Sequence, residues 1–345
     1  MPSRATDTAS TPLEGVDLLL ADLDGVVYTG DDPLPYAVES INRAHLSIRV
    51  GYITNNASRT AESVARHLSD LGLTVVGDDV VTSPQAAIVL LAELIPAGST
   101  VLVVGGEGLT SVVEAHGFRV TRSAEDAPAA VIQGFHPSVA WTDLAEAAFA
   151  LRPPADGGPG IPWIATNTDW TIPQARGTAP GNGTLVSAVH TAVGRLPVVA
   201  GKPERAIFDA AVERFSASSP LFLGDRLDTD VLGANRAGIA SALVLTGIDG
   251  PKQVLAVDAD SRPTFLLGDL RELFEPYPAP VEERDPRTGD RVFRSGTSVV
   301  RLAGDVVGID ALGDRDIDLL RAGTAAVWGA GVPIYALDVA PGLYS

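Results

Sequence analysis

Short apolar runs alternate with amphipathic stretches along most of the chain. An apolar run bounded by turn residues predicts a buried strand, and apolar residues three or four apart predict a helix. The expected strands are the run starting at Leu18, Arg49–Thr54, Val101–Val104, Ala129–Gln133, Trp163–Thr166, Pro220–Gly224, Ile239–Leu245 and Thr264–Leu267. The expected helices are Tyr36–His45, Thr60–Leu71, Glu107–His116, Val139–Ala150, Thr184–Val193, Asp228–Ala237 and Asp269–Phe274. This alternation predicts an α/β fold, with a Rossmann-like parallel sheet between layers of helices.

The length of 345 residues predicts more than one domain. We expect a tail without regular structure at 1–14, a core formed by 15–83 and 199–275, and an α/β domain inserted at 84–198. A Pro-rich, charged linker at 276–288 then leads into a small α+β domain at 289–345. That last domain is predicted from short alternating strands, a helix near Asp316–Val327 and a final strand at Pro333–Leu337, and its sequence does not indicate a role.

Charge and composition exclude several classes of protein. The net charge of −18 argues against a nucleic-acid or anionic-membrane partner, because both require a basic surface. No apolar run reaches the ~20 residues of a membrane span. The absence of cysteine removes disulfides and thiol chemistry, and it agrees with a place in the cytoplasm. An anionic substrate would therefore need a metal ion or a few placed cations, and Lys202 is one of only two lysines.

Four short polar motifs each follow an expected strand. Asp22 and Asp24 stand two residues apart, so both side chains leave an extended strand on the same face. The other three motifs are Tyr52–Asn56, Gly201–Pro203 and Gly224–Asp230. Ligands of parallel sheets bind at the carboxyl ends of the strands, so we expect the four motifs to converge on one rim. Carboxylates for a hard cation, hydroxyl and amide donors and one ammonium suit phosphoryl transfer with Mg²⁺.

Each motif alone also allows a simpler interpretation. The Asp22–Asp24 pair could be a solvated turn, and Asp228 or Thr229 could cap a helix. Gly105–Gly108 follows a strand but lacks the full dinucleotide-binding spacing, so we expect a tight turn there. The scattered histidines do not predict a zinc site.

Together, the four motifs resemble the signature motifs of the haloacid dehalogenase (HAD) superfamily. More narrowly, the chain is similar to the phosphatases of that superfamily that have a large α/β cap, the NagD-like or phosphoglycolate/glycerol-phosphate phosphatase group. The resemblance spans Leu18–Glu275 and includes D-x-D-G-V-x-Y, I-T-N-N, G-K-P and G-D-R-x-x-T-D. The stretches Thr166–Asp169 and Pro180–Gly183 resemble segments of that group's cap.

The resemblance implies roles for the four aspartates. Asp22 would be the nucleophile that forms an aspartyl-phosphate, and Asp24 would be the general acid and then the general base. Mg²⁺ would be held by the carboxylate of Asp22, the backbone carbonyl of Asp24 and the carboxylate of Asp225. Asp230 would orient a metal-bound water or the Lys202 ammonium.

The resemblance also implies phosphate-binding and specificity groups. Thr54 and the adjacent amide of Asn55 would hold phosphoryl oxygens, while Lys202 would neutralise charge on them and on Asp22. The cap residues expected to face the substrate are Asn167, Asp169, Arg176 and Asn182. His136 stands where relatives tend to carry an acid, which separates this cap from theirs.

The implied activity is Mg²⁺-dependent hydrolysis of a small phosphomonoester. Glycerol 3-phosphate is the leading substrate and 2-phosphoglycolate the second, while sugar phosphates, pyridoxal phosphate and nucleoside monophosphates remain open. Two other classes also remain: a phosphotransferase or mutase that uses the same Asp22 chemistry, and a non-catalytic regulator that keeps the fold. The sequence leaves a homo-oligomer open.

Overall fold

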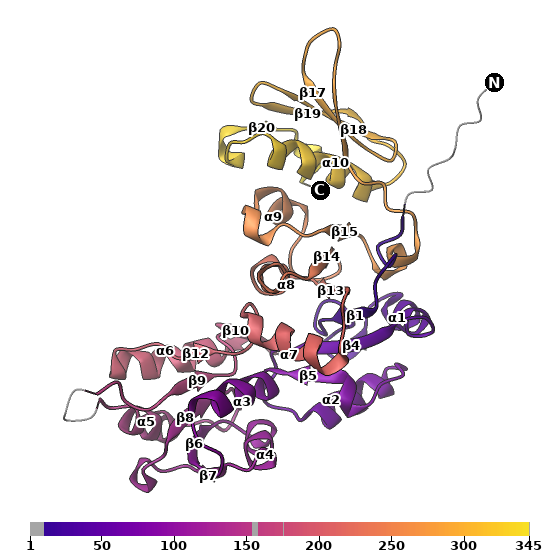
Figure 1. Cartoon of the computed structure of the whole chain (residues 1–345). Helices are drawn as coiled ribbons and strands as arrows, with labels where there is room; N and C mark the ends of the chain where they lie inside the picture. The colour runs from indigo at the N-terminus through magenta and orange to yellow at the C-terminus, as the bar shows by residue number, and fades with distance from the viewer. Residues whose placement is uncertain (1–9, 154–157, 175, 345) are drawn as a thin grey trace. The chain divides into compact units, whose positions relative to one another are not determined.

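The structure is a computed structural model, and it describes residues 10–153, 158–174 and 176–344. The chain divides into two compact units. Figure 1 colours the chain by residue number, from indigo at the N-terminus to yellow at the C-terminus. The first unit holds the chain up to Thr29, Pro33–Ile48 and the chain from Ser219 onward, and the second holds Gly30–Asp32 and Arg49–Ser218. The tail predicted at 1–14 lies outside the described residues as far as residue 9, and the predicted domain boundaries stay predictions.

Four parallel strands form the sheet of the first unit, in the order β15-β14-β13-β1. They are β1 (Leu18–Ala21), β13 (Pro220–Gly224), β14 (Ala240–Val244) and β15 (Phe265–Leu267). All four residues of β1 are buried. Helices cover both faces of a parallel sheet, so a strand within it is buried on both sides and its sequence is a continuous apolar run. Their carboxyl ends share one edge, since the register pairs Ala21 with Leu223.

The first unit also contains short helices and helical turns. They are α1 (Ala37–His45), the π-helical turn η3 (Leu227–Val231), α8 (Leu232–Ala237), α9 (Pro251–Ala256), and the 3-10 turns η4 (Ala259–Ser261) and η5 (Leu270–Phe274). Two further strands of two residues are β2 (Tyr28–Thr29) and β3 (Asp32–Pro33). The helix predicted at Asp228–Ala237 is therefore a π-helical turn followed by α8, and it ends at Gly238 with φ +74°.

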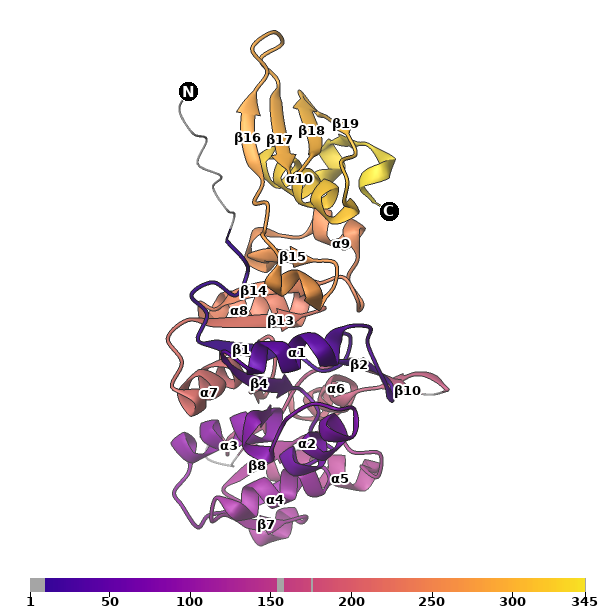
Figure 2. The same ribbon diagram turned by 90° about the vertical axis from the view of Figure 1, so that its right-hand side faces the viewer.

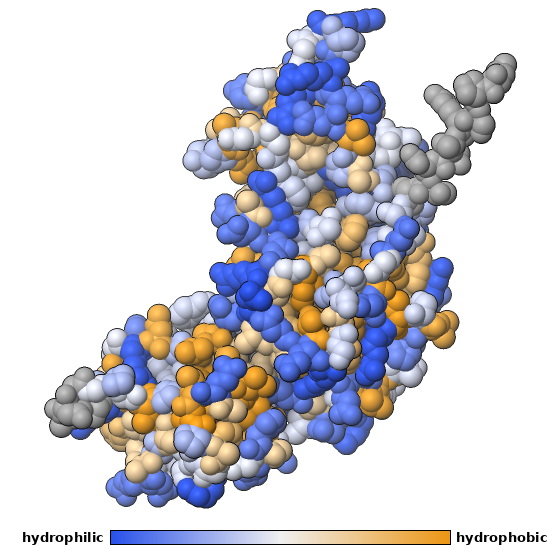
Figure 3. All heavy atoms as spheres, viewed as in Figure 1, coloured by the Kyte–Doolittle hydropathy of each residue, from blue (hydrophilic) through white to orange (hydrophobic). Residues whose placement is uncertain are grey.

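The C-terminal part of the first unit is a five-stranded sheet with one long helix. The strands run in the order β16 (Val281–Arg284), β17 (Arg291–Ser295), β18 (Ser298–Ala303), β19 (Val306–Ala311) and β20 (Asp338–Val339). Helix α10 (Asp316–Gly329) packs across β17 and β18 (Figure 2), and two 3-10 turns follow it, η6 (Ile334–Ala336) and η7 (Pro341–Leu343). Hydrophilic side chains gather where β16 turns into β17 (Figure 3), and there Arg301 pairs with Asp285 and Asp290.

Two details of this C-terminal part differ from the sequence prediction. The stretch 276–288, predicted as a linker, contains strand β16, whose four residues are all exposed and so show no apolar alternation. The final strand, predicted at Pro333–Leu337, is instead η6 followed by β20, which pairs in parallel with β19. The apolar residues there resembled a strand, but Pro333 precedes a 3-10 turn.

One hydrophobic cluster joins the two parts of the first unit. It contains Leu227 and Val231 of η3 and Leu243 of β14, together with residues of β17–β19, α10 and η7. The buried guanidinium of Arg321, on α10, donates to the carbonyl of Leu266 from Nε at 3.0 Å and from Nη2 at 2.5 Å. The C-terminal sheet and helix therefore complete the core beside the motif that contains Asp225 and Asp230.

The second unit contains a separate parallel sheet in the order β12-β9-β8-β6-β7. Its strands are β6 (Thr100–Val104), β7 (Arg119–Thr121), β8 (Ala130–Gln133), β9 (Trp163–Ala165) and β12 (Val198–Val199). Helices α4 (Glu107–Ala115), α5 (Trp141–Ala150) and α6 (Asn182–Val193) and the 3-10 turn η2 (Ala124–Asp126) accompany it. The hairpin of β10 (Thr171–Gln174) and β11 (Gly177–Pro180) precedes α6.

The same unit also contains the parallel pair β4 (Arg49–Thr54) and β5 (Val80–Thr82). This pair is contacted by helices α2 (Ala61–Asp70), α3 (Ser83–Leu94) and α7 (Arg205–Phe215) and by the 3-10 turn η1 (Gly77–Asp79). Strand β4 has the predicted bounds, and α2 begins after Thr60, whose side chain accepts from the backbone N–H of Ser63. The predicted α/β class with parallel sheets and a small α+β C-terminal part is confirmed. None of the described helices has the length and apolarity that a membrane crossing requires.

Candidate active site

Asp22 and Asp24 follow directly on the buried strand β1. The backbone N–H of Asp22 donates to the carbonyl of Leu223 at 2.9 Å, which continues the pairing of β1 with β13 beyond the strand. The chain then turns at Gly25, whose φ of +80° suits glycine, and the N–H of Gly25 donates to the carbonyl of Tyr28. Asp22 is half-buried and Asp24 is exposed, so the two carboxyls have different surroundings.

Three carboxylates meet at this edge of the first unit. One oxygen from each of Asp22, Asp225 and Asp230 lies within 4.8 Å of the other two, and both Asp225 and Asp230 are buried. Asp230 Oδ2 accepts from the backbone N–H groups of Asp225 and Arg226, each at 3.1 Å. The π-helical turn η3 thus folds Asp230 back onto the start of its own motif.

Glycines fix the position of the Asp225 carboxylate. A Cβ at Gly25 or at Gly247 would overlap that carboxylate, and a Cβ at Gly224 would overlap Asp230. Asp225 Oδ2 also accepts from the backbone N–H of Ile248 at 2.8 Å. Backbone therefore surrounds this side chain closely, and each of these positions requires glycine.

The loop after β14 contains a residue that sequence reasoning missed. Asp249 accepts from the backbone N–H of Leu227 at 2.7 Å, and its own N–H donates to the carbonyl of Asp225 at 3.2 Å. Thr246 Oγ1 donates to the carbonyl of Gly25 at 2.8 Å. Burial raises the pKa of Asp249 above its usual range, against the opposing effect of the Leu227 hydrogen bond. The sequence signal was an acid two residues after Thr-Gly, at the end of a strand.

The donor set of this cluster fits a magnesium ion. Mg²⁺ prefers oxygen ligands and is commonly bound through one or two carboxylates plus water. Among the residues that the structure describes, Asp22, Asp225 and Asp230 form the one group of three or more acidic or histidine side chains close enough to share a metal. The contribution predicted for Asp24 comes from its backbone carbonyl, so its side chain need not join the group.

The predicted phosphate-binding residues lie in the second unit. Thr54 ends β4, is buried, and accepts from the backbone N–H of Asn56 through Oγ1 at 3.1 Å. The side chain of Asn55 donates to the carbonyl of Lys202 at 3.1 Å and accepts from the N–H of Lys202 at 2.8 Å. Lys202 is only 4% exposed. The structure therefore brings Asn55 and Lys202 together, while the predicted convergence of all four motifs stays a prediction.

Three of the four predicted cap residues join this hydrogen-bonded group. Asp169 accepts from Asn55 Nδ2, and Asn167 Nδ2 donates to the carbonyl of Asn55 at 2.7 Å. Asn182, in the first turn of α6, donates to the carbonyl of Asn167 at 2.7 Å. Arg176 is exposed, follows the β10 strand at the hairpin turn, and has no contact here among the described residues.

The glycine-rich stretch Gly105–Gly108 has a packing explanation. A Cβ at Gly106 would overlap the ring of His136, and one at Gly108 would overlap the carbonyls of Ala57 and Arg59. Helix α4 begins directly after Gly106. This arrangement agrees with the tight turn that the sequence favours over a dinucleotide site.

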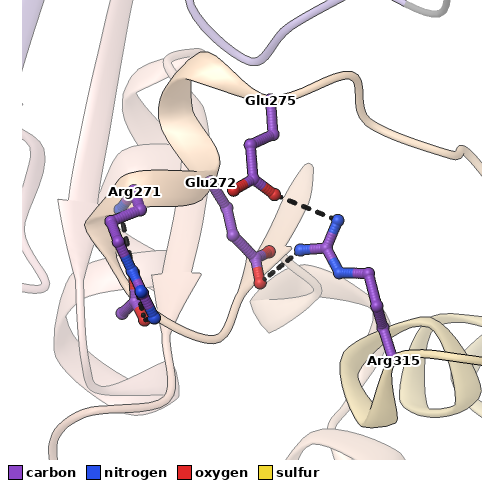
Figure 4. A pocket seen from close by; sticks show the side chains of 5 residues that line it. Arg271, Glu272, Glu275 and Arg315 are labelled. Carbon is purple, nitrogen blue, oxygen red and sulfur yellow. Dashed lines mark hydrogen bonds and ion pairs between the residues drawn. The ribbon is translucent and has the colours of Figure 1, made fainter.

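The first unit also has a cavity of about 420 Å³ (Figure 4). None of Asp22, Asp225 and Asp230 lines it. Its lining side chains pair with one another: Arg315 with Glu272 at 2.7 Å and Glu275 at 3.1 Å, and Arg271 with Asp269 at 2.7 Å. The guanidinium of Arg271 also lies 3.7 Å from the centre of the Tyr36 ring. Each acid that lines the cavity pairs with a guanidinium group, and among the described residues these acids do not form a group that could share a metal ion.

Comparison with known proteins gives consistent matches. A family model described as haloacid dehalogenase-like hydrolase matches residues 19–119, and a second HAD-hydrolase-like model matches residues 199–273. The D-glycerol 3-phosphate phosphatase of Mycobacterium tuberculosis is 43% identical over 315 residues, which cover 91% of this chain and 86% of that protein. An acid sugar phosphatase of Staphylococcus saprophyticus is 33% identical and covers 74% of this chain and 96% of that protein.

A solved structure is similar over nearly the whole chain. The crystal structure of a glycerol phosphate phosphatase from Mycobacterium tuberculosis, in complex with magnesium, has a TM-score of 0.83 and 40% sequence identity to this chain. The alignment covers 96% of this chain and 95% of that one. The similarity therefore includes the C-terminal sheet and helix, which lie beyond both family-model matches.

Proposed function

We propose that this chain, a phosphatase that belongs to the haloacid dehalogenase-like hydrolase family, uses Mg²⁺ to hydrolyse glycerol 3-phosphate to glycerol and phosphate. The observation that carries the proposal is the group of Asp22, Asp225 and Asp230, with ligand oxygens within 4.8 Å of one another. Three buried or half-buried carboxylates at such distances repel one another, and a divalent cation relieves that repulsion.

The carboxylates of Asp22 and Asp225 and the carbonyl of Asp24 would hold the ion, with Asp230 fixing the turn around it. When bound, Mg²⁺ supplies positive charge that screens a phosphate dianion from the attacking carboxylate. The hydrogen bonds to Asp225 Oδ2 and Asp230 Oδ2 support this division, because they orient both side chains before any ion binds.

Asp22 would act as the nucleophile. Its carboxylate oxygen attacks phosphorus, the bond from phosphorus to the glycerol oxygen breaks, and Asp24 gives its proton to the departing alkoxide. Asp24 then takes a proton from the water that attacks the aspartyl-phosphate, which releases phosphate and restores Asp22. The different burial of the two carboxyls supports different roles, since a proton shuttle needs access to solvent and substrate.

The phosphoryl oxygens would be held by the hydroxyl of Thr54, the backbone N–H of Asn55 and the ammonium of Lys202. The side chain of Asn55 is committed to Lys202 and Asp169, so its backbone N–H is the group offered to phosphate. A buried ammonium interacts more strongly with a phosphoryl group than an exposed one, because less water screens it.

Glycerol 3-phosphate is proposed because the M. tuberculosis relative, with the higher of the two identities reported, is named for that substrate. A sugar phosphate is the second candidate, favoured by the similarity to the staphylococcal acid sugar phosphatase. We further propose that the enzyme acts in the cytoplasm, with which the absence of cysteine agrees, and that it does not bind nucleic acid, which the net charge of −18 supports.

A phosphate-release assay on a panel of esters tests the proposal. The panel contains glycerol 3-phosphate, 2-phosphoglycolate, sugar phosphates, pyridoxal phosphate and nucleoside monophosphates, each with Mg²⁺ and with a chelator. Glycerol 3-phosphate should give the highest kcat/KM, and the chelator should abolish release. Phosphate and glycerol should appear in equal amounts, whereas a shortfall of phosphate would indicate transfer to another hydroxyl. Turnover that survives chelation would overturn the metal assignment.

A further inference from the structure

The side chain of Asn55 connects two distant segments of the second unit. Its Nδ2 donates to Asp169 Oδ1 at 3.1 Å, to Asp169 Oδ2 at 3.3 Å and to the carbonyl of Lys202 at 3.1 Å. Its Oδ1 accepts from the backbone N–H of Lys202 at 2.8 Å. Both ends of the amide are therefore used, and Lys202 is held through both of its main-chain polar groups.

The backbone of Asn55 is tied to the same region. Its carbonyl accepts from Asn167 Nδ2 and from the hydroxyl of Ser83, each at 2.7 Å. Asn167 Oδ1 in turn accepts from the backbone N–H of Asp169 at 3.1 Å. The segment 167–169 thus meets Asn55 at two places, and rotation of the Asn55 side chain would break contacts on both sides.

The close packing at Gly201 is an independent observation for the same contact. A Cβ at Gly201 would overlap both Asn55 Oδ1 and the carbonyl of Thr166. The N–H of Gly201 donates to that Thr166 carbonyl at 2.7 Å. Glycine at this position lets the backbone before Lys202 approach the Asn55 amide closely enough for its hydrogen bonds.

We propose that Asn55 is a positioning residue for Lys202, and that Asp169 is the anchor that holds the Asn55 amide in its orientation. This inference rests on the proposed function. The sequence predicts that Asp169 faces the substrate. We propose instead that Asp169 acts indirectly, by orienting the Asn55 amide. The electrostatic effect of an ammonium depends on its distance from the phosphoryl oxygens, so the main chain beneath Lys202 must be fixed.

The chemistry at position 55 requires an amide. An aspartate there could still accept from the N–H of Lys202, but it would have no donor and would face the Asp169 carboxylate. Exchanging the two residue types, Asn55→Asp together with Asp169→Asn, returns one donor and one carboxylate to the pair. The exchange therefore restores the hydrogen bond between positions 55 and 169, and the carboxylate at position 55 can still accept from the N–H of Lys202, but the carbonyl of Lys202 loses its donor, so we expect a partial recovery.

The test compares Asn55→Asp, Asp169→Asn and the exchange variant by kcat, KM, the dissociation constant for inorganic phosphate and urea unfolding. Asn55→Asp should lower kcat/KM about 100-fold, mostly in kcat, because hydrogen bonds to a charged partner are lost. The exchange variant should recover at least tenfold of that loss. Asn56→Asp is the matched control, because it adds the same charge one residue further on, where the side-chain oxygen accepts from the backbone N–H of Ser58. The decrease in kcat/KM should be at least tenfold smaller in Asn56→Asp than in Asn55→Asp.

Two outcomes would overturn the inference: no recovery of kcat or phosphate affinity in the exchange variant, or a recovery confined to the free energy of unfolding. The second would show a purely structural link. The affinity for inorganic phosphate separates this inference from the proposed function. If the wild type hydrolyses no ester on the panel but phosphate binding still weakens in Asn55→Asp and recovers in the exchange variant, the function is wrong and the positioning role stands.

Discussion

Two clusters of charged side chains in the first unit follow opposite rules. Around Asp225, three acids bring oxygens within 4.8 Å of one another. Around Glu272, acids alternate with guanidinium groups: Glu272 contacts Arg315 and Arg321, while Asp318 contacts Arg321 at 2.7 Å. In the first cluster the acids lie close to one another, whereas in the second each of these acids pairs with a guanidinium group.

This difference in charge pairing is the one expected between a site that binds a ligand and a network that stabilises the fold. Repulsion between like charges that lie close together lowers the free energy of unfolding. A bound cation removes this repulsion, so the cluster should bind a cation favourably. A neutralised network leaves little field for a ligand, but removing one member leaves a buried charge without its partner. The first cluster should therefore control activity and the second should control stability.

The largest expected effect is on activity, from Asp22→Asn. If Asp22 is the nucleophile as we propose, its loss should lower kcat by about 10⁴-fold or more, because an asparagine cannot form the aspartyl-phosphate. The melting temperature should not fall. Steady-state phosphate release and a thermal melt check both, and activity near that of the wild type would remove the distinction between the two clusters.

The next effect is on stability, from Arg321→Met. Arg321 is 1% exposed and pairs with Asp318 and Glu272. Its removal takes the guanidinium partner from the buried Asp318 and one of the two guanidinium partners from Glu272, so it should cost about 3 kcal/mol. Urea unfolding measures the loss, while kcat should stay close to that of the wild type. Arg315→Met is the matched control, because Arg315 is 35% exposed and should cost less than 1 kcal/mol. Equal losses in both variants would show that burial does not set the cost.

A smaller effect with the opposite sign is expected from Asp225→Asn. The asparagine oxygen can still accept from Ile248, and one of three neighbouring charges is removed. The metal-free protein should therefore unfold with a free energy about 1 kcal/mol higher, and Mg²⁺ should no longer raise the melting temperature. Thermal melts with and without Mg²⁺ measure both changes. A metal-free variant less stable than the wild type would mean that the cluster is not strained by its own charge.

The smallest effect concerns pH. The hydrogen bonds from Arg271 hold the pKa of Asp269 below its usual range. A carboxyl with a depressed folded-state pKa adds stability at pH values above its unfolded pKa and loses it as the pH falls through the folded pKa. Arg271→Ala should therefore be less stable than the wild type at neutral pH, with the gap closing below about pH 4. Thermal melts of both proteins from pH 7 to pH 3 test this, and a gap that widens in acid would contradict it.

The sequence predicts the strands that carry the chemistry better than it predicts their supports. Strand β4 and the start of β1 could be found because parallel strands are continuous apolar runs that end in polar residues. Strand β16 could not be found, since all its residues are exposed and it is stabilised by cross-strand ion pairs such as Arg291 with Glu282. Its sequence has the composition of a linker.

The same limit applies to the site. The acids Asp22, Asp225 and Asp230 could be singled out because they stand in polar motifs at strand ends that resemble those of a known family, and the structure brings their oxygens within 4.8 Å of one another. The hydrogen bonds of Asn55 to Asp169 and of Leu227 to Asp249 could not, because they join residues far apart in sequence through ordinary polar side chains. Spacing within a motif predicts what a residue can do, whereas contacts across motifs decide what holds it in place.

The hydrophobic cluster shared by η3 and the C-terminal part has a consequence for how the protein is made. Leu227 and Val231 flank Asp228 and Asp230, and they share their cluster with α10 and with Leu343 of η7. A chain emerging from the ribosome cannot complete the packing beneath this turn until residue 343 has been synthesised. We therefore expect the turn that contains Asp230 to complete its packing late in synthesis, although Asp22, whose carboxylate lies close to that of Asp230, is synthesised much earlier.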